Sequence, residues 1–155
     1  MKTRIAASAL VFLLTITFAI SICYTGQGSL ANKVIVIDPG HGGTYPGAVA
    51  NGVREADINL AVGLKLSEKL AMSGATIVMT RDSDVKLTPA GASLRADLQA
   101  RVDVAKNSNA DIFISIHANS APDATIVGAI SFYATDRPNN LAQSIQFALA
   151  KYKSA

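Results

Sequence analysis

The sequence predicts an α/β fold in which helices flank a mostly parallel, twisted sheet. Short β-branched, apolar runs alternate along the chain with longer segments whose apolar residues recur every four positions. Alternation of strands and helices is typical of a parallel sheet. The strands are continuously apolar, which indicates a sheet that is covered on both faces. The 155 residues are enough for one domain of this kind.

Each element is bounded by glycine, proline or polar residues. Strands are expected at residues 34–38, 75–80, 111–117 and about 127–133. Helices are expected at residues 55–72, about 93–107 and 141–152. The apolar side of the first helix carries Ile58, Val62, Leu66 and Leu70, and that of the second carries Leu94, Leu98, Val102 and Ala105. Asp97 and Arg101 form a favourable pair one helical turn apart.

The N-terminus has the pattern of a secretory signal. Basic residues precede an uncharged run of 18 residues, Ala6–Cys23, and small and polar residues lead to a possible cleavage site after Ala31. An uncleaved membrane anchor is the alternative, because 18 residues lie near the lower limit for spanning a bilayer. Lipidation at Cys23 is a third, less favoured interpretation. Each of them places residues 32–155 outside the cytoplasmic membrane, secreted, in the periplasm or in the cell wall.

Composition excludes several classes of function. Without residues 1–31 the chain has 12 basic and 11 acidic residues, so it lacks the basic surface of a nucleic-acid-binding protein. A single cysteine excludes a disulfide framework and a four-cysteine zinc site. The glycine-rich loop at residues 40–47 lacks the phosphate-binding pattern, and no nucleophile elbow is present. Ser115 is interpreted as a packing residue.

The two histidines and one glutamate are the candidate metal ligands. His41 follows the first strand and His117 closes the third, and ligands gather at the carboxyl ends of strands in open α/β sheets. Glu55 begins the first helix, whereas Glu68, the other glutamate, falls on its charged face. Two histidines and one glutamate suit zinc with one position open for water. The alternative is that the two histidines are unrelated polar residues at strand ends. In that case Glu55 only makes a favourable interaction with the dipole of its helix.

Four sequence blocks resemble the zinc-dependent N-acetylmuramoyl-L-alanine amidases of bacterial cell walls. The resemblance covers about residues 33–153, and the blocks occur in the family's order. They are Val36-Ile-Asp-Pro-Gly-His-Gly-Gly43, Pro46-Gly-Ala48 with Gly52-Val-Arg-Glu55, Thr80-Arg81 with Asp84, and Ala110-Asp-Ile-Phe-Ile-Ser-Ile-His-Ala-Asn119.

The resemblance implies a phosphorylase/hydrolase-like amidase architecture and a zinc ion held by His41, Glu55 and His117. It also implies hydrolysis of the amide between N-acetylmuramic acid and L-alanine, with peptidoglycan as partner. Asp38 is a candidate to hold the other ring N–H of His41, and a role in the Asp-Pro-Gly turn is the alternative. Oligomeric state is left open.

The resemblance also predicts a missing part. The family's general-base glutamate lies downstream of its second histidine, and here no glutamate follows Glu68, so its place is expected beyond Ala155. We therefore expect residues 32–155 to be a catalytic domain that lacks its last strands and helix, with an unknown catalytic base and feeble activity. The alternatives are a non-catalytic peptidoglycan-binding protein that keeps the zinc site, and another zinc hydrolase such as a peptidase or a deacetylase.

Overall fold

The computed structural model describes residues 29–120, 125 and 128–151. The chain divides after Asn119 into two compact units, and each unit is described by itself. The predicted signal or anchor, residues 6–23, lies outside the described residues. Among the helices that are described, none has the length and apolar character needed to cross a membrane.

The expected position of the catalytic glutamate is not tested by the structure. Ala155, beyond which this residue is expected, lies outside the described residues, as do residues 152–154 before it. The absence of a general base from residues 32–155 therefore stays a prediction from the sequence.

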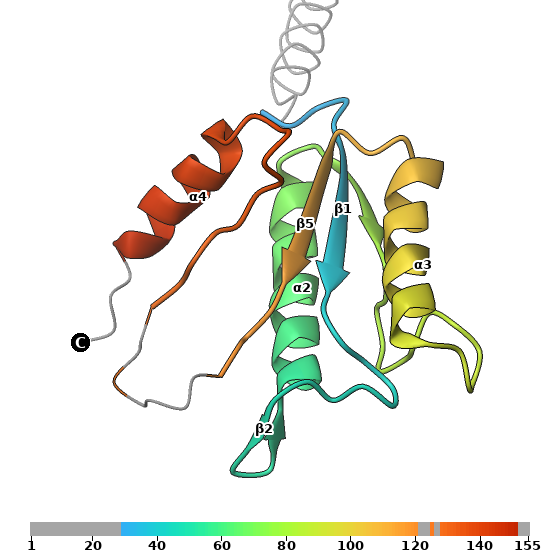
Figure 1. Cartoon of the computed structure of the whole chain (residues 1–155). Helices are drawn as coiled ribbons and strands as arrows, with labels where there is room; N and C mark the ends of the chain where they lie inside the picture. Colours follow the sequence, from blue (N-terminus) through green and yellow to red (C-terminus); the bar gives the residue numbers. More distant parts are fainter. Residues whose placement is uncertain (1–28, 121–124, 126–127, 152–155) are drawn as a thin grey trace, which may run out of the picture. The chain divides into compact units, whose positions relative to one another are not determined.

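The first unit is built on a three-stranded parallel sheet with β1 (Val34–Pro39) in the centre (Figure 1). One neighbour of β1 is β4 (Thr76–Met79), with Val36 opposite Val78. The other is β5 (Ile112–Ile116), with Asp38 opposite Ser115. Since all three strands are parallel, their carboxyl ends lie at the same edge of the sheet. The three predicted strands of this unit are confirmed.

Two helices lie on opposite faces of this sheet. The expected cover of both faces holds for the buried strand β1 but not for β5, where Phe113 is 41% exposed. Helix α2 (Glu55–Met72) connects β1 to β4, and α3 (Leu94–Asn107) runs back across the sheet to β5. Right-handed connections that cross a sheet in opposite directions place their helices on opposite faces. The alternation of β1 agrees, because Pro39 packs against α2 whereas the neighbouring Asp38 bonds to α3. A short hairpin, β2 (Val49–Ala50) and β3 (Val53–Arg54), leads directly into α2.

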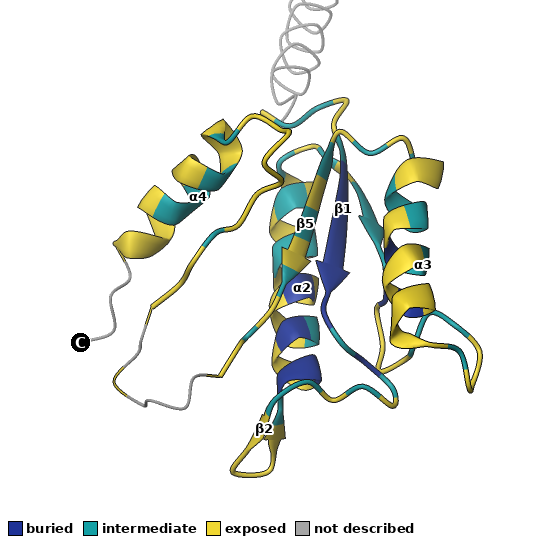
Figure 2. Cartoon of the chain, viewed as in Figure 1, coloured by how far each residue is buried: buried dark blue, intermediate teal, exposed yellow. Residues whose placement is uncertain are grey.

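The core is concentrated in β1 and the first turns of α2, as the dark blue segments of Figure 2 show. Ile35, Val36 and Ile37 are at most 2% exposed. The buried residues of α2 are Glu55, Ala56, Asn59 and Gly63. Gly63 is required by close approach, since a Cβ there would lie 2.8 Å from Cγ of Pro39.

The apolar sides expected for the two helices are at most half-buried, at Leu66, Leu70 and Ala105, and their other members are exposed. In α2, Ile58 and Val62 are 42% and 46% exposed. In α3, all of Leu94, Leu98 and Val102 are at least 44% exposed, whereas the buried residues are Asp97 and Arg101. The physical reason is specific to each helix. At Gly63, helix α2 lies too close to Pro39 of β1 for a side chain, and α3 directs the Asp97–Arg101 ion pair inward.

The second unit contains α4 (Asn140–Ala150), which confirms the third predicted helix. The strand expected at residues 127–133 is wrong for its described part, residues 128–133, which has no strand. The side chain of Gln146 occupies backbone groups at residues 129 and 131 that a β-strand would use to bond a neighbouring strand. Its side-chain amide donates to the Ala129 carbonyl at 2.8 Å and accepts from the Ser131 N–H at 2.7 Å.

Candidate metal centre

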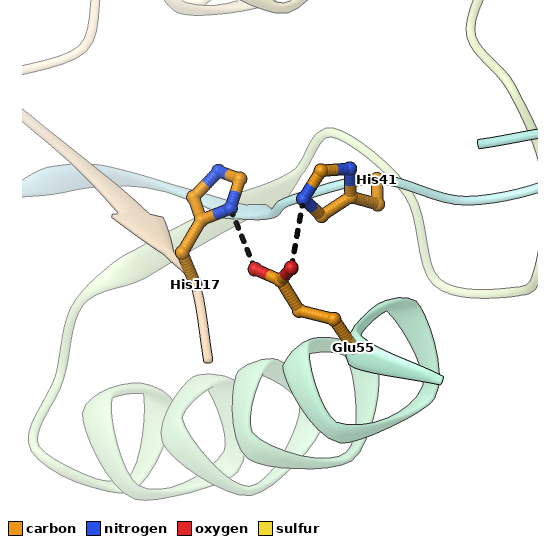
Figure 3. A group of neighbouring side chains, drawn as sticks. All are labelled: His41, Glu55 and His117. Atoms are coloured by element: carbon orange, nitrogen blue, oxygen red, sulfur yellow. Dashed lines mark hydrogen bonds and ion pairs between the residues drawn. The ribbon is translucent and has the colours of Figure 1, made fainter. Parts of the chain in front are cut away.

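Three segments that are distant in sequence meet at the carboxyl edge of the sheet. His41 lies two residues beyond the end of β1, and His117 comes directly after β5. Glu55 is the first residue of α2, which starts at this edge because the β2–β3 hairpin turns the chain back into it. The parallel arrangement therefore places all three predicted ligands at one point, as Figure 3 shows.

The Glu55 carboxylate lies between the two imidazole rings. Its Oε1 is 3.0 Å from Nδ1 of His117, and its Oε2 is 3.2 Å from Nε2 of His41. The ring centroids are 4.8 Å apart with the planes at 83°. The Glu55 side chain is 5% exposed, whereas those of His41 and His117 are 28% and 39% exposed. The carboxylate thus forms the buried floor of the cluster, and the imidazoles form its accessible side.

Backbone groups fix the carboxylate in this position. The Ala48 N–H donates to Oε2 at 3.0 Å, and the Ala118 N–H donates to Oε1 at 3.2 Å. Burial alone raises the pKa of Glu55, but the Ala48 hydrogen bond and the two histidines outweigh it, so the net pKa is lowered. Glu55 is therefore held as a carboxylate, the form that binds a metal.

The cluster fits a tetrahedral zinc ion. One ligand atom from each residue lies within 4.8 Å of the others. Zinc bonds of 2.0–2.2 Å in a tetrahedron place ligand atoms about 3.4 Å apart, close to the two separations of 3.0 and 3.2 Å. Two neutral imidazoles and one carboxylate are a donor set of catalytic zinc sites. With three protein ligands the fourth position stays open on the accessible side.

Gly40 permits the backbone of the β1 turn to pass directly beneath the His117 ring. A Cβ at residue 40 would lie 2.3 Å from both Cε1 and Nε2 of that ring. No side chain other than hydrogen fits this space with the ring in place.

Asp38 does not have the role of a direct partner of the His41 ring. Among the described residues its carboxylate accepts from Thr80 and Ser115, each at 2.7 Å, and from Arg101 at 2.8 Å. The expected contact is therefore corrected in favour of the structural role, in which Asp38 ties its neighbours on both sides of β1. Ser115, interpreted from the sequence as a packing residue, is one of these hydrogen-bond donors.

A polar clamp joins the glycine-rich loop to the hairpin beside the centre. Asp84 accepts from the Gly43 N–H at 2.8 Å and from both terminal nitrogens of Arg54 at 2.9 and 3.0 Å. The Arg54 hydrogen bonds and the Gly43 N–H lower the pKa of Asp84. Glu68, by contrast, is not among the buried residues of α2 and takes no part in the cluster, as predicted.

Sequence reasoning missed the importance of two buried arginines. Arg81 entered only through the Thr-Arg block, and Arg101 only through its pair with Asp97, which the structure confirms at 3.0 Å. Both guanidinium groups lie under the metal centre, and the two residues are 3% and 4% exposed. For Arg101 the sequence did contain a signal, which is its pairing with Asp97 four positions earlier on a side of the helix that does not carry Leu94, Leu98 and Val102.

An α/β domain with two imidazoles and a carboxylate at the carboxyl edge of its sheet has the architecture of a mononuclear zinc hydrolase. Comparison with known families narrows this class. The N-acetylmuramoyl-L-alanine amidase family model matches residues 35–154, and the chain belongs to this family.

Curated relatives agree with the family. The germination-specific N-acetylmuramoyl-L-alanine amidase of Bacillus subtilis is 40% identical over 109 residues, which cover 67% of this chain and 46% of the relative. The amidase LytC of the same organism is 35% identical over 128 residues, covering 80% of this chain and 24% of the relative. The chain thus spans less than half the length of these two relatives.

Solved structures give the same result. The CwlD amidase of Clostridioides difficile, solved in complex with the GerS lipoprotein, has a TM-score of 0.69 and 35% identity, over 80% of this chain and 70% of that one. The catalytic domain of the amidase CwlV from Bacillus (Paenibacillus) polymyxa has a TM-score of 0.63 and 35% identity, over 72% and 59%. The predicted amidase architecture is confirmed.

Proposed function

We propose that this protein hydrolyses the amide bond between N-acetylmuramic acid and L-alanine of peptidoglycan, with zinc held by His41, Glu55 and His117. The observation that carries the proposal is the convergence of these three side chains within 4.8 Å at the sheet edge. Membership of the amidase family supplies the substrate class. The donor set supports zinc in preference to magnesium or calcium, which favour oxygen ligands.

The chain's own residues supply a fixed, one-sided site. Glu55 is anchored by two backbone N–H groups and closes the buried side of the cluster. The partly exposed rings of His41 and His117 leave the other side open to a polymer that is too large to enter a closed cavity. When bound, zinc supplies a Lewis acid that polarises the scissile carbonyl and lowers the pKa of water.

The proposed location follows from the substrate. Peptidoglycan lies outside the cytoplasmic membrane, and we propose that residues 1–31 deliver the chain there as a cleaved signal, or hold it there as an anchor through residues 6–23. We propose residues 32–155 as the amidase domain. The assignment of residues 1–31 rests on the sequence pattern, because residues 1–28 lie outside the described part of the chain. The assignment of residues 32–155 is supported by the family model, which matches residues 35–154.

The test is a hydrolysis assay with the full chain in mild detergent and purified peptidoglycan. We expect slow release of stem peptides that carry a free L-alanine amine, since no general base has been identified, together with loss of release after chelation and recovery with zinc. Glu55→Gln keeps the side-chain shape but removes the charge, so release should stop. Glu68→Gln is the matched control on the same helix, outside the cluster, and its release should equal that of the parent. Release that persists after chelation would refute the zinc-dependent reaction.

The position of Glu68 favours a second candidate function, binding of peptidoglycan without cleavage. Apart from Glu55, Glu68 is the only glutamate in the sequence, and 13 residues of helix place it about 20 Å from Glu55. At that distance Glu68 cannot act as the general base at the cluster. A positioned general acid–base contributes about 10²–10⁴-fold to such reactions. A chain that binds one zinc and sediments with peptidoglycan but releases no free amine would have this second function.

A further inference from the structure

The turn that follows β1 directs three consecutive carbonyl groups at two buried guanidinium groups. The carbonyls of Pro39, Gly40 and His41 all accept hydrogen bonds from Arg81 or Arg101. His41 itself has φ +64°, in the left-handed region that residues with side chains rarely occupy. The ligand therefore sits on a backbone conformation that its neighbours must hold.

Arg101 holds the end of this turn. Its Nη2 donates to the His41 carbonyl at 2.9 Å, and its Nη1 donates to the Pro39 carbonyl at 3.0 Å. The guanidinium is oriented from behind by Asp97, which accepts from Nε at 3.0 Å, and by Asp38, which accepts from Nη1 at 2.8 Å. Helix α3 thus contributes no ligand but fixes the backbone of one.

Arg81 joins the same turn to the helix that carries Glu55. Its Nε donates to the Pro39 carbonyl at 2.8 Å, and its Nη2 donates to the Gly40 carbonyl at 3.0 Å. The same Nη2 donates to the Ala56 carbonyl at 2.8 Å, one residue beyond Glu55. A single guanidinium therefore fixes the spacing between the segments that carry two of the three candidate ligands.

The third ligand segment is tied in through Asp38. Ser115 donates to the Asp38 carboxylate at 2.7 Å, and it lies two residues before His117 on β5. Arg101 donates to the other carboxylate oxygen of Asp38. All three candidate ligand segments are thus connected through one hydrogen-bond network, which is buried at Asp38, Arg81 and Arg101 and is more open at Ser115.

The composition of this network argues against a role in stability alone. Replacing buried ion pairs by apolar residues of similar size is often neutral or stabilising. Here burial and the neighbouring charge of Arg101 both disfavour the charged form of Arg81. Every hydrogen bond that the structure describes for Arg81 ends on a backbone carbonyl. The planar fork is used to position main chain rather than to neutralise charge.

We propose that Arg81 and Arg101 are positioning residues that set the ligand geometry of the metal centre by holding the main chain at residues 39–41 and 56. The inference rests on the proposed zinc site for its consequence, but its geometric part applies to the metal-free protein as well. Both side chains act through the backbone of the ligand segments and not as ligands themselves.

The experiment compares Arg101→Lys and Arg81→Lys with the parent full chain in detergent. Lysine keeps the charge but cannot reproduce the fork. Ile77→Ala on β4 is the control, because it removes apolar packing without touching the turn. Two quantities are measured on each folded protein. One is the zinc dissociation constant, measured by chelator competition. The other is the hydrogen-exchange rate of the Gly42 amide in the metal-free protein, where this amide donates to the Tyr45 carbonyl at 2.8 Å.

We expect each lysine variant to weaken zinc binding about 10–100-fold, as loss of groups that orient metal ligands typically does. Exchange at Gly42 should accelerate at least about tenfold more than exchange in the middle of α2, since the turn is released locally. In Ile77→Ala the zinc affinity should stay within about threefold of the parent. Hydrogen exchange at Gly42 should accelerate no more than at other amides, because a general loss of stability affects all of them alike.

The inference would be overturned if, in the lysine variants, hydrogen exchange at Gly42 accelerated by the same factor as exchange in the middle of α2. Unfolding of both lysine variants by circular dichroism would also overturn it, because the guanidinium groups would then hold the whole fold. A parent that binds no zinc would refute the proposed function. The geometric part of the inference is then decided by the exchange measurement alone.

Discussion

The space beneath the His117 ring offers a sharp test of the metal centre, through the substitution Gly40→Ala. The backbone at residue 40 has no positive φ, so alanine brings no conformational strain of its own. The added Cβ would lie 2.3 Å from Cε1 and Nε2 of His117 and 2.8 Å from its Nδ1. The methyl group and the ring cannot occupy their present positions together.

The required movement can be estimated from ordinary contact distances. Non-bonded carbon atoms rest about 3.5–4.0 Å apart, so relief of the 2.3 Å contact needs a shift of at least about 1.2 Å. Zinc–nitrogen bonds are confined to about 2.0–2.1 Å. A displacement of this size removes His117 from the ligand set, and we expect zinc affinity to fall at least about 100-fold, which is about 2.7 kcal/mol.

The assay is zinc binding by competition with a chromogenic chelator, alongside urea unfolding to confirm that the variant folds. Gly52→Ala is the matched control, because a Cβ there has no heavy atom within 4 Å. Its φ of +78° makes alanine cost about 1 kcal/mol in stability, but zinc affinity should not change. A folded Gly40→Ala protein whose zinc affinity is within about threefold of the parent would refute the role of His117.

Two further predictions concern the packing of the helices. Gly63→Ala lies in a helix interior, where alanine normally gains about 1 kcal/mol, but its Cβ would be 2.8 Å from Pro39, so we expect urea unfolding to show a loss of about 1–3 kcal/mol. A gain in stability would contradict the close approach. For Asp97, burial raises the pKa, but the hydrogen bond and charge of Arg101 outweigh it and the net pKa is lowered. Its stabilising contribution is therefore present above the unfolded value near 3.9 and is lost as pH falls through the lower folded pKa. Asp97→Asn should be less stable at pH 7 and should lose less stability than the parent between about pH 5 and 2, and equal slopes in that range would contradict the assignment.

Local pattern was sufficient to predict the three strands of the parallel sheet and the place of the candidate ligands, but not the short hairpin of β2 and β3. The β-branched run at residues 34–38 ends at Pro39-Gly40, which locates the carboxyl end of the central strand. Because parallel strands end at one edge, histidines at the ends of two such strands come together without any information on packing. The structure brings His41 and His117 to that edge, with ring centroids 4.8 Å apart.

The faces of the helices could not be predicted in the same way. Helical periodicity places Leu94, Leu98 and Val102 on one side of α3, and an apolar side is expected to point inward. Arg101 points inward instead, because its guanidinium donates to the Asp38 carboxylate and to the His41 carbonyl. These two acceptors lie 63 and 60 residues away in sequence. Periodicity within one helix contains no information on such distant acceptors.

The failed strand at residues 127–133 has a related cause. Its β-branched and aromatic residues fit the strand pattern, but a strand also needs a neighbouring backbone to bond. In the described part, the polar groups of Ala129 and Ser131 are bonded to the side chain of Gln146 instead. Strand propensity describes the fit of a side chain to a sheet and does not supply the partner strand.

The most direct test of the metal centre is the number and environment of zinc ions bound to the folded full chain. Elemental analysis should give one zinc per chain, and X-ray absorption should give two nitrogen ligands and carboxylate oxygen at about 2.0–2.2 Å. His117→Ala should reduce zinc to below about one tenth per chain at the same free zinc concentration, while Glu68→Gln keeps one. A folded parent that binds no zinc, or equal zinc in the parent and His117→Ala, would contradict the assignment of His41, Glu55 and His117 as its ligands.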